Sequence, residues 1–261
     1  MIIRARTVVP MASDPIENGA VAIHENRILA VGRFSDIERQ PDENVLDLGE
    51  RILLPGLINA HCHLDYTVLR GKIAPQRSFA DWIRAINAEK ATLSEQDYVD
   101  SIRTGFSEAR RFGTTTVVNL TAVPKLVGAI AEPIRTWWFG ELIDIRNPGQ
   151  AGQIVDEAVA DLESARHWGL APHAPFTASP QLYARCEEIT REKNVLLTTH
   201  LAESREEMEM FRDARGTAFD FLKNIGRPMD DCGHETPVSR FLRTRTIDHR
   251  WIIAHLNELD P

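Results

Sequence analysis

The residues most able to do chemistry are histidines that follow short apolar stretches, and the first two stand close together. His61 and His63 come directly after the stretch 57–60. Alternate residues of a β-strand project from the same face, so both imidazoles can reach one metal ion at the end of this strand. Cys62 projects to the opposite face and is expected to pack rather than to bind metal. Two chance histidines in a loop would give the same pattern.

Three more apolar stretches along the chain end in histidine. These stretches lead to His173, His200 and His255. The chain has nine histidines in 261 residues, and their repeated placement at stretch ends favours a shared site over a random scatter. Histidine is the commonest metal ligand, and three imidazoles leave a zinc ion an open position for water. The pattern therefore predicts a metal centre.

A glutamate follows one of these histidines at the turn into a predicted helix. Glu203 lies three residues after His200. A carboxylate in this place can move protons between a metal-bound water and a substrate. Acids are also common at helix N-termini, where the helix dipole favours them. Glu206 and Glu207 therefore stay open as alternatives for the proton-transfer role.

The elements that must position these residues alternate between strands and helices. Strands are predicted at Leu57–His61, Thr115–Leu120, Ile134–Leu142, Gly169–His173, Val195–His200 and Trp251–His255. Helices are predicted between them at Glu95–Arg111, Gln153–Arg166, Pro180–Lys193 and Ser204–Arg215. Such alternation indicates an α/β fold with a parallel sheet. Six repeats favour a (β/α)8 TIM-type barrel, whose active sites lie at the carboxyl ends of the strands. A doubly wound sheet is the alternative on pattern alone.

The barrel is expected to occupy residues 55–261 and to be preceded by a different kind of domain. Residues 1–54 read as short strands, including a hairpin over 19–31 around Glu25-Asn26, and are predicted to form part of a small β-sandwich. Only six of the eight strands of a barrel are present, so we expect the chain to be truncated after strand six. An irregular stretch over 214–246 is expected to form an excursion or lid above the barrel.

Composition excludes several classes of protein. The net charge is −8, without a long basic cluster, which argues against nucleic-acid binding. No run of 18 apolar residues occurs, which argues against a membrane span. The three cysteines are far apart and form no disulfide framework. A cytoplasmic location is therefore expected.

The motifs around these histidines resemble a known family. The segment Leu54-Pro55-Gly56-Leu57-Ile58-Asn59-Ala60-His61-Cys62-His63 resembles the signature of the amidohydrolase superfamily. Later motifs are similar to its cytosine deaminase, chlorohydrolase and S-adenosylhomocysteine deaminase branch: Leu69-Arg70-Gly71, Pro172-His173-Ala174-Pro175, His200-Leu201-Ala202-Glu203 and Ala254-His255. The similarity extends along the whole chain and includes the N-terminal strands, which that family uses in a sandwich completed by C-terminal strands.

The resemblance implies a role for each strand-end residue. His61 and His63 would bind the metal from strand one, and His200 would bind it from strand five.

The same resemblance makes Glu203 the proton shuttle, and His255 would orient or activate the water. His173 would contact the substrate. Arg70, just beyond strand one, is a candidate for holding a polar or anionic substrate group.

Two departures from the family pattern matter for the chemistry. The family uses an aspartate at the end of strand eight, which this sequence does not reach, and Asp260 follows strand six too closely to replace it. Binuclear members use a carboxylated lysine at the end of strand four, where this sequence has His173. One divalent metal ion is therefore expected, with Zn2+ favoured and Fe2+ as the alternative.

The function that the resemblance implies is hydrolytic deamination of an aminated purine or related heterocycle by a metal-activated water. Aminofutalosine deaminases are one specific candidate within that branch. The alternatives are a non-catalytic metal-binding fragment that lacks the strand-eight aspartate, and a dechlorinating or other amidohydrolase. The expected partner is a small heterocyclic substrate, and a homodimer is compatible with the resemblance.

Overall fold

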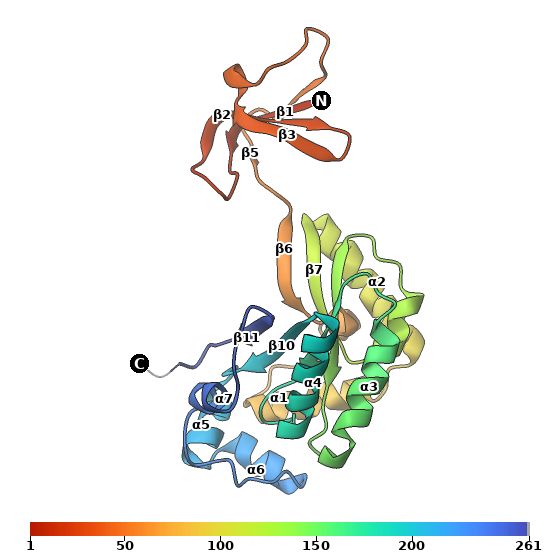
Figure 1. The fold of residues 1–261 in the computed structure, drawn as a ribbon, viewed down its shortest axis with the longest axis vertical. Coiled ribbons are helices and arrows are strands. Elements are labelled where there is room, and N and C mark those ends of the chain that lie inside the picture. Colours follow the sequence, from red (N-terminus) through yellow and green to blue (C-terminus); the bar gives the residue numbers. More distant parts are fainter. Residues whose placement is uncertain (260–261) are drawn as a thin grey trace. The chain divides into compact units, whose positions relative to one another are not determined.

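The computed structural model describes residues 1–259, so Asp260 lies outside the described residues. The chain divides into two compact units, of which one comprises Met1–Leu57 and the other begins at Ile58 (Figure 1). The predicted domain boundary lies between residues 54 and 55, close to this division.

The first unit is a five-stranded sheet. Its strands are β1 (Ile2–Val8), β2 (Ile16–His24), β3 (Arg27–Arg33), β4 (Val45–Asp47) and β5 (Ile52–Leu53). The antiparallel pair β2–β3 is the predicted hairpin, and its turn contains Glu25, whose φ of 52° lies in the left-handed region. Strand β1 pairs with β4 and β5 in parallel. Ile2, Ala20 and Ile37 form the small core of this unit. Its place in a composite sandwich remains a prediction.

The second unit contains the predicted α/β barrel architecture. Its strands are β6 (Leu57–Cys62), β7 (Thr114–Thr121), β8 (Arg135–Leu142), β9 (Trp168–Pro172), β10 (Leu196–Leu201) and β11 (Trp251–His255). They form one sheet in sequence order, and the pairs from β7 to β11 are parallel. All six predicted strands are confirmed, with ends that differ by at most one residue.

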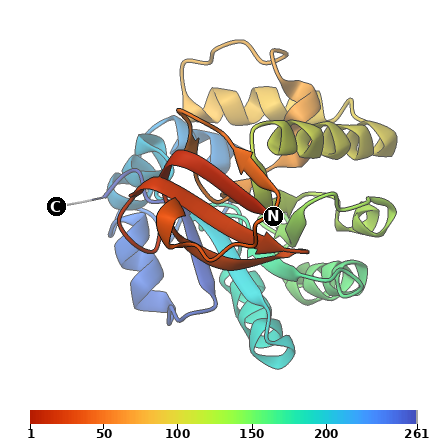
Figure 2. The same ribbon diagram turned by 90° about the horizontal axis from the view of Figure 1, so that it is seen from above.

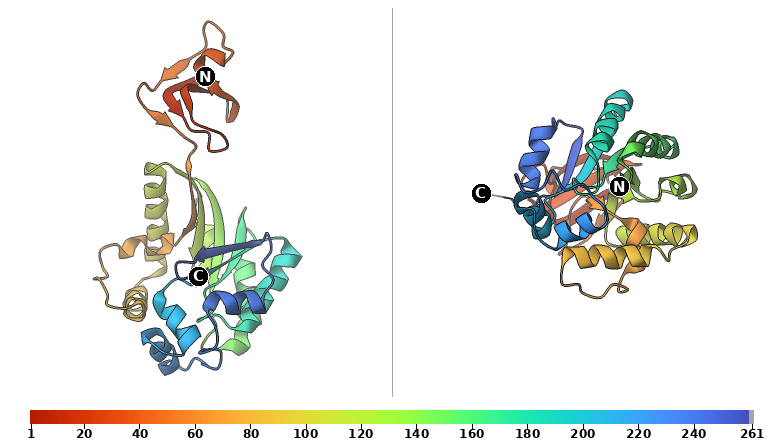
Figure 3. Two further views of the ribbon diagram at one scale, coloured as in Figure 1. Left: turned by 90° about the vertical axis from the view of Figure 1, so that its left-hand side faces the viewer. Right: turned by 90° about the horizontal axis from the view of Figure 1, so that it is seen from below.

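Helices cover the outer side of these strands (Figures 2 and 3). They include α2 (Glu95–Arg111), α3 (Ala151–Leu162), α4 (Pro180–Lys193) and α5 (Arg205–Asp213). Serines that accept from backbone N–H groups begin α2 and α4, and Asn194 in the left-handed region ends α4. These local signals explain why the predicted bounds of α2 and α4 are the observed ones. Apolar side chains of α2, α3 and α4 bury against the strands in a single large core.

Three helices were not predicted as elements. Helix α1 (Phe79–Lys90) lies after β6, and α6 (Thr217–Asn224) and α7 (Pro237–Thr244) occupy about half of the stretch expected as an irregular excursion. Each of the last two is short and follows a glycine or begins with a proline, which read as loop signals in sequence. Helix α6 packs against α1 and α5. Within residues 1–259, no helix is both long and apolar enough to cross a membrane.

A glycine in β9 is a sensitive test of this packing. A Cβ atom at Gly169 would lie 2.5 Å from the carbonyl oxygen of Leu196 and 2.4 Å from the ring of Phe139. We expect Gly169→Ala to lower the free energy of unfolding by about 1–3 kcal/mol or more. At Gly152 in α3, a Cβ would meet no atom of the described residues within 4 Å. Gly152→Ala should therefore raise stability, by roughly 0.5–1 kcal/mol. Urea unfolding of both variants checks this, and equal effects would contradict the packing described.

Candidate metal centre

The strands bring four predicted histidines into mutual contact. His61 on β6 lies with its ring centre 4.9 Å from that of His200 on β10 and 5.2 Å from those of His63 and His255. The rings of His63 and His200 stack at 5.3 Å. Side chains predicted from separate strand ends therefore share one site, as in other parallel barrels.

Residues next to the histidines at the end of β6 form hydrogen bonds with β7. The thiol of Cys62 contacts the carbonyl oxygen of Val118 at 3.3 Å and packs against the large core. Burial raises the pKa of this thiol to about 12, so it stays protonated at neutral pH and is a poor metal ligand. The backbone N–H of Leu64 donates to Asn119 at 2.7 Å. These contacts hold the His61–His63 segment in place.

The ring nitrogens have the arrangement that a divalent cation requires. Nδ1 of His200 lies 2.8 Å from the carbonyl oxygen of His173, which can only accept, so Nδ1 carries the hydrogen and Nε2 keeps its lone pair. This Nε2 lies 3.2 Å from Nε2 of His63. Two nitrogens bound to one tetrahedral zinc at its usual bond length lie roughly 3.3 Å apart. The spacing therefore fits a shared cation.

The protonation states of the histidines also favour a shared cation. Burial, with the neighbouring histidines, lowers the pKa of His61 to about 4 and that of His200 to about 2. Both rings are therefore neutral at pH 7 and offer lone pairs. Nδ1 of His61 is buried without a hydrogen-bond partner among the described residues.

Two sets of ligand atoms converge, and they share one histidine. His200 groups with His61 and His255, and it also groups with His63 and Glu141, with all ligand atoms of a set within 4.8 Å of one another. Neither set contains both His61 and His63, so the three predicted ligands do not form one such set, and their assignment as ligands of a single ion remains a prediction. Glu141, at the end of β8, was not anticipated from the sequence. The available signal was an acid near the carboxyl end of a strand in the same sheet as the strands that lead to the four histidines.

The predicted catalytic pair lies at the ends of β10 and β11. Oε1 of Glu203 is 3.7 Å from Nε2 of His255. Burial, assisted by the charge of Glu141, raises the pKa of Glu203 to about 7, while burial lowers that of His255. His255 and Leu256 both have positive φ values, 74° and 55°. Such strained backbone is typical of functional sites, and here it turns the chain directly after His255.

A second buried glutamate, Glu207, forms hydrogen bonds with the backbone at Glu203. The carboxylate of Glu207 accepts from the backbone N–H of Glu203 at 2.8 Å and from that of Ala202 at 3.1 Å. Ala202 has a φ of 51°, so the turn after β10 is also in the left-handed region. Glu207 therefore holds the backbone of Glu203 and does not itself face the site. Burial raises its pKa to about 8.

The two predicted substrate contacts differ in their surroundings. Nδ1 of His173 lies 2.6 Å from Oγ1 of Thr177, and burial lowers the pKa of His173 to about 3. The structure thus fixes a neutral ring beside the histidine cluster. Arg70 also lines the cavity, but its side chain is 68% exposed and pairs with Glu108. Its guanidinium is therefore already engaged at the rim.

A cavity of about 630 Å³ opens onto the histidines. One wall is apolar and comes from helix α1, from which Phe79, Trp82 and Ile83 line the space. Phe79 stacks on Trp82 with ring centres 5.8 Å apart and meets Phe176 edge-on. Cavities of this size with a few converging polar groups are typical small-molecule sites.

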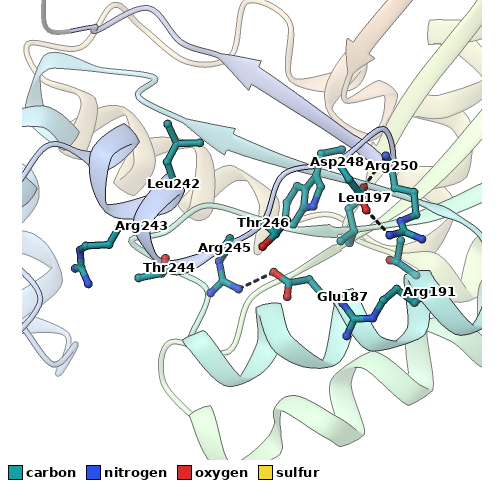
Figure 4. Close-up of a pocket in the computed structure, with 12 residues that line it drawn as sticks. Glu187, Arg191, Leu197, Leu242, Arg243, Thr244, Arg245, Thr246, Asp248 and Arg250 are labelled. Carbon is teal, nitrogen blue, oxygen red and sulfur yellow. Dashed lines mark hydrogen bonds and ion pairs between the residues drawn. The ribbon is translucent and has the colours of Figure 1, made fainter.

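Another cavity, of about 570 Å³, lies between α4 and the segment before β11 (Figure 4). Two of its arginines pair with acids of the same lining: Arg245 contacts Glu187 at 2.9 Å, and Arg250 pairs with Asp248. None of its lining residues is a histidine. The groups that can do chemistry gather in the first cavity.

Comparison with known proteins identifies the class that this fold and site define. Residues 52–230 match the amidohydrolase family, and the chain belongs to that family. A 5-methylthioadenosine/S-adenosylhomocysteine deaminase of Nitratidesulfovibrio vulgaris is 32% identical over 220 residues, which are 78% of this chain and 49% of the relative. The chain thus spans about half the length of the curated relatives it matches.

Solved structures support the fold. Helicobacter pylori aminofutalosine deaminase, in complex with methylthio-coformycin, superposes with a TM-score of 0.75 at 18% identity, covering 88% of this chain and 58% of that one. An adenosine deaminase from Xanthomonas campestris with bound zinc gives 0.70 at 22% identity, covering 99% and 58%. These structural similarities confirm the predicted barrel fold, while the family match and the sequence similarity to the Nitratidesulfovibrio vulgaris deaminase confirm the predicted family branch.

The buried Glu207 should make stability depend on pH. Its pKa is raised from 4.5 to about 8, so the folded protein holds this proton more tightly than the unfolded chain does. Its contribution to stability is fully present below about pH 4.5 and is lost as the pH rises toward 8. We expect Glu207→Gln to flatten this part of the profile. Urea unfolding at several pH values measures it, and an unchanged slope would contradict the assignment.

Proposed function

We propose that this protein is a metal-dependent hydrolase that removes an amino group from an aminated purine or a related heterocycle. The observation that carries the proposal is the convergence of neutral strand-end imidazoles and the buried Glu203 on one cavity with an aromatic wall. Imidazoles that are neutral at pH 7 suit a metal centre, and a carboxyl group with a pKa near neutrality suits proton transfer.

A single divalent cation is proposed at His61, His63 and His200. Zinc is favoured because the donors are imidazoles, and ferrous iron is the alternative. A bound cation of this kind lowers the pKa of a water ligand from about 15.7 to about 7 and so supplies a nucleophile at neutral pH. The zinc in the Xanthomonas campestris structure supports this choice.

The protein's own side chains would move the protons. His255 is neutral at pH 7, because burial lowers its pKa, and its Nε2 can orient or accept a proton of the attacking water. Glu203 has a pKa of about 7, so it carries a proton in part of the population and can give it to a ring nitrogen of the substrate. The 3.7 Å between the two groups allows the proton to pass between them directly or through one water.

The cavity wall suits a flat heterocycle. Phe79, Trp82 and Phe176 provide an aromatic surface against which a purine can pack. His173, held by Thr177, is proposed to contact the substrate through Nε2. Arg70 is proposed to reach a polar group of the substrate only after leaving Glu108. The names of the relatives, which are deaminases of methylthioadenosine, S-adenosylhomocysteine and 5'-deoxyadenosine, indicate this substrate class.

Two further assignments go with this function. We propose a cytoplasmic location, which suits the three cysteines, all free thiols in the described chain. A homodimer is proposed on the strength of the family resemblance alone.

Replacement of Glu203 is the direct test of the mechanism. We expect Glu203→Gln to lower the deamination rate by at least about 100-fold, because the amide cannot carry the proton, while the metal stays bound. Glu209→Gln is the matched control on α5, the helix that follows Glu203, since Glu209 pairs with Arg205 and does not line the cavity. Ammonia release from methylthioadenosine, S-adenosylhomocysteine, 5'-deoxyadenosine and guanine gives the rate, and elemental analysis gives the metal content.

The outcomes separate the candidate functions. Retained turnover in Glu203→Gln would remove the shuttle role from this residue. A protein that binds zinc but releases neither ammonia from these compounds nor chloride from a chlorotriazine would be a non-catalytic metal-binding protein. Chloride release alone would make it a dechlorinating member of the family.

A further inference from the structure

Glu141 is a buried acid whose presence the proposed mechanism does not explain. It lies on β8 one residue before the strand ends, and its side chain is only 5% exposed. Its oxygen Oε1 has no hydrogen-bond partner among residues 1–259. A buried carboxylate oxygen without a partner is costly. A group in this state is expected to have a partner in the working form of the site.

The nearest candidate partner of this oxygen is Nδ1 of His63, a proposed metal ligand. Oε1 of Glu141 lies 3.7 Å from Nδ1 of His63. That Nδ1 is also buried without a hydrogen-bond partner in the described chain. The opposite nitrogen, Nε2 of His63, is the one that lies 3.2 Å from Nε2 of His200. Two unpaired polar atoms thus face each other across a gap slightly longer than a hydrogen bond.

Metal binding through Nε2 of His63 requires its Nδ1 to be a hydrogen-bond donor, and Oε1 of Glu141 can be the acceptor. If His63 offers the lone pair of Nε2 to a cation, its hydrogen must reside on Nδ1, because a neutral imidazole carries only one. Nδ1–H then needs an acceptor, and Oε1 of Glu141 is placed to accept. His200 shows the same logic, with its Nδ1–H donating to the carbonyl oxygen of His173. In each of the two rings, the nitrogen opposite the proposed metal-binding nitrogen thus has its own acceptor.

We propose that Glu141 is a positioning residue that fixes the tautomer and the orientation of His63 through a hydrogen bond from Nδ1. This inference rests on the proposed role of His63 as a ligand. In the metal-loaded protein, the gap of 3.7 Å closes to hydrogen-bond length. Carboxylates that hold a ligand histidine in this way typically change metal affinity by roughly 10- to 100-fold.

A direct bond from Glu141 to the cation is the competing assignment. Glu141, His63 and His200 do form a set of ligand atoms within 4.8 Å of one another. However, the ion-pair approach of Glu141 to His63 is to Nδ1, whereas the nitrogen that faces His200 is Nε2. The carboxylate therefore lies behind the ring, which favours positioning over ligation.

The affinity for zinc tests this inference without any need for turnover. Zinc binding to the whole chain is measured by competition with a chromophoric chelator for wild type, Glu141→Ala and Glu141→Gln. Glu141→Ala removes the acceptor and should weaken binding by roughly 10- to 100-fold. Glu141→Gln keeps a carbonyl oxygen that can accept from Nδ1–H, so it should recover most of the affinity.

A control and a spectroscopic measurement separate positioning from ligation. Asp144 is another buried acid just beyond β8, where it accepts from the backbone N–H of Ser179 at 2.7 Å. Asp144→Asn should lower stability and leave zinc affinity unchanged. With Co2+ in place of zinc, the visible spectrum of Glu141→Gln should match that of wild type, because no donor atom has changed.

Three results would overturn the inference. Wild-type zinc affinity in Glu141→Ala would show that His63 needs no acceptor there. Equal loss in Glu141→Gln and Glu141→Ala, with an altered cobalt spectrum, would make Glu141 a ligand instead. A wild-type chain that binds no zinc would remove both the metal site and this role. Failure to deaminate with zinc binding intact would count against the proposed function only.

Discussion

The hydrogen-bond register of the parallel strands determines where the reactive side chains lie. In the β10–β11 pair, His200 lies opposite Ala254 and Leu201 lies opposite His255. For His200, a shift of one residue would turn the side chain away from the cavity, because successive side chains of a strand point to opposite faces. His255 pairs with Leu201, whose side chain lies in the core, so the positive φ of 74° at His255 is needed to turn its ring into the cavity. The core between the strands and α2, α3 and α4 holds this register, so the chemistry depends on packing that lies outside the site.

Buried acids set the electrostatics around the neutral imidazoles. Glu141, Glu203 and Glu207 lie near the cluster, and burial raises the pKa of Glu203 and Glu207 because their charged forms are poorly solvated there. A divalent cation would offset this cost by supplying the missing positive charge. The same surroundings keep the histidines neutral and thus able to bind it. The neutral imidazoles and the acids together therefore form a candidate cation site.

Much of this arrangement could be predicted from local patterns, and the exceptions have a physical cause. The strand-end histidines follow apolar stretches, and serine caps mark α2 and α4, so sequence alone located them. Glu141 escaped notice because its importance depends on which ring it faces across the barrel. The backbone contacts of Glu207 are equally invisible in sequence. The apolar wall from α1 needed its packing against α6 to be known. The ligand assignments and the limits of the domains remain predictions.

The central claim is that one cation binds between the strand-end imidazoles, and X-ray diffraction from zinc-loaded crystals at the zinc absorption edge tests it most directly. The account predicts one anomalous peak about 2.0–2.1 Å from a nitrogen of each of His61, His63 and His200. A peak elsewhere on the chain, or none at full zinc loading, would contradict it.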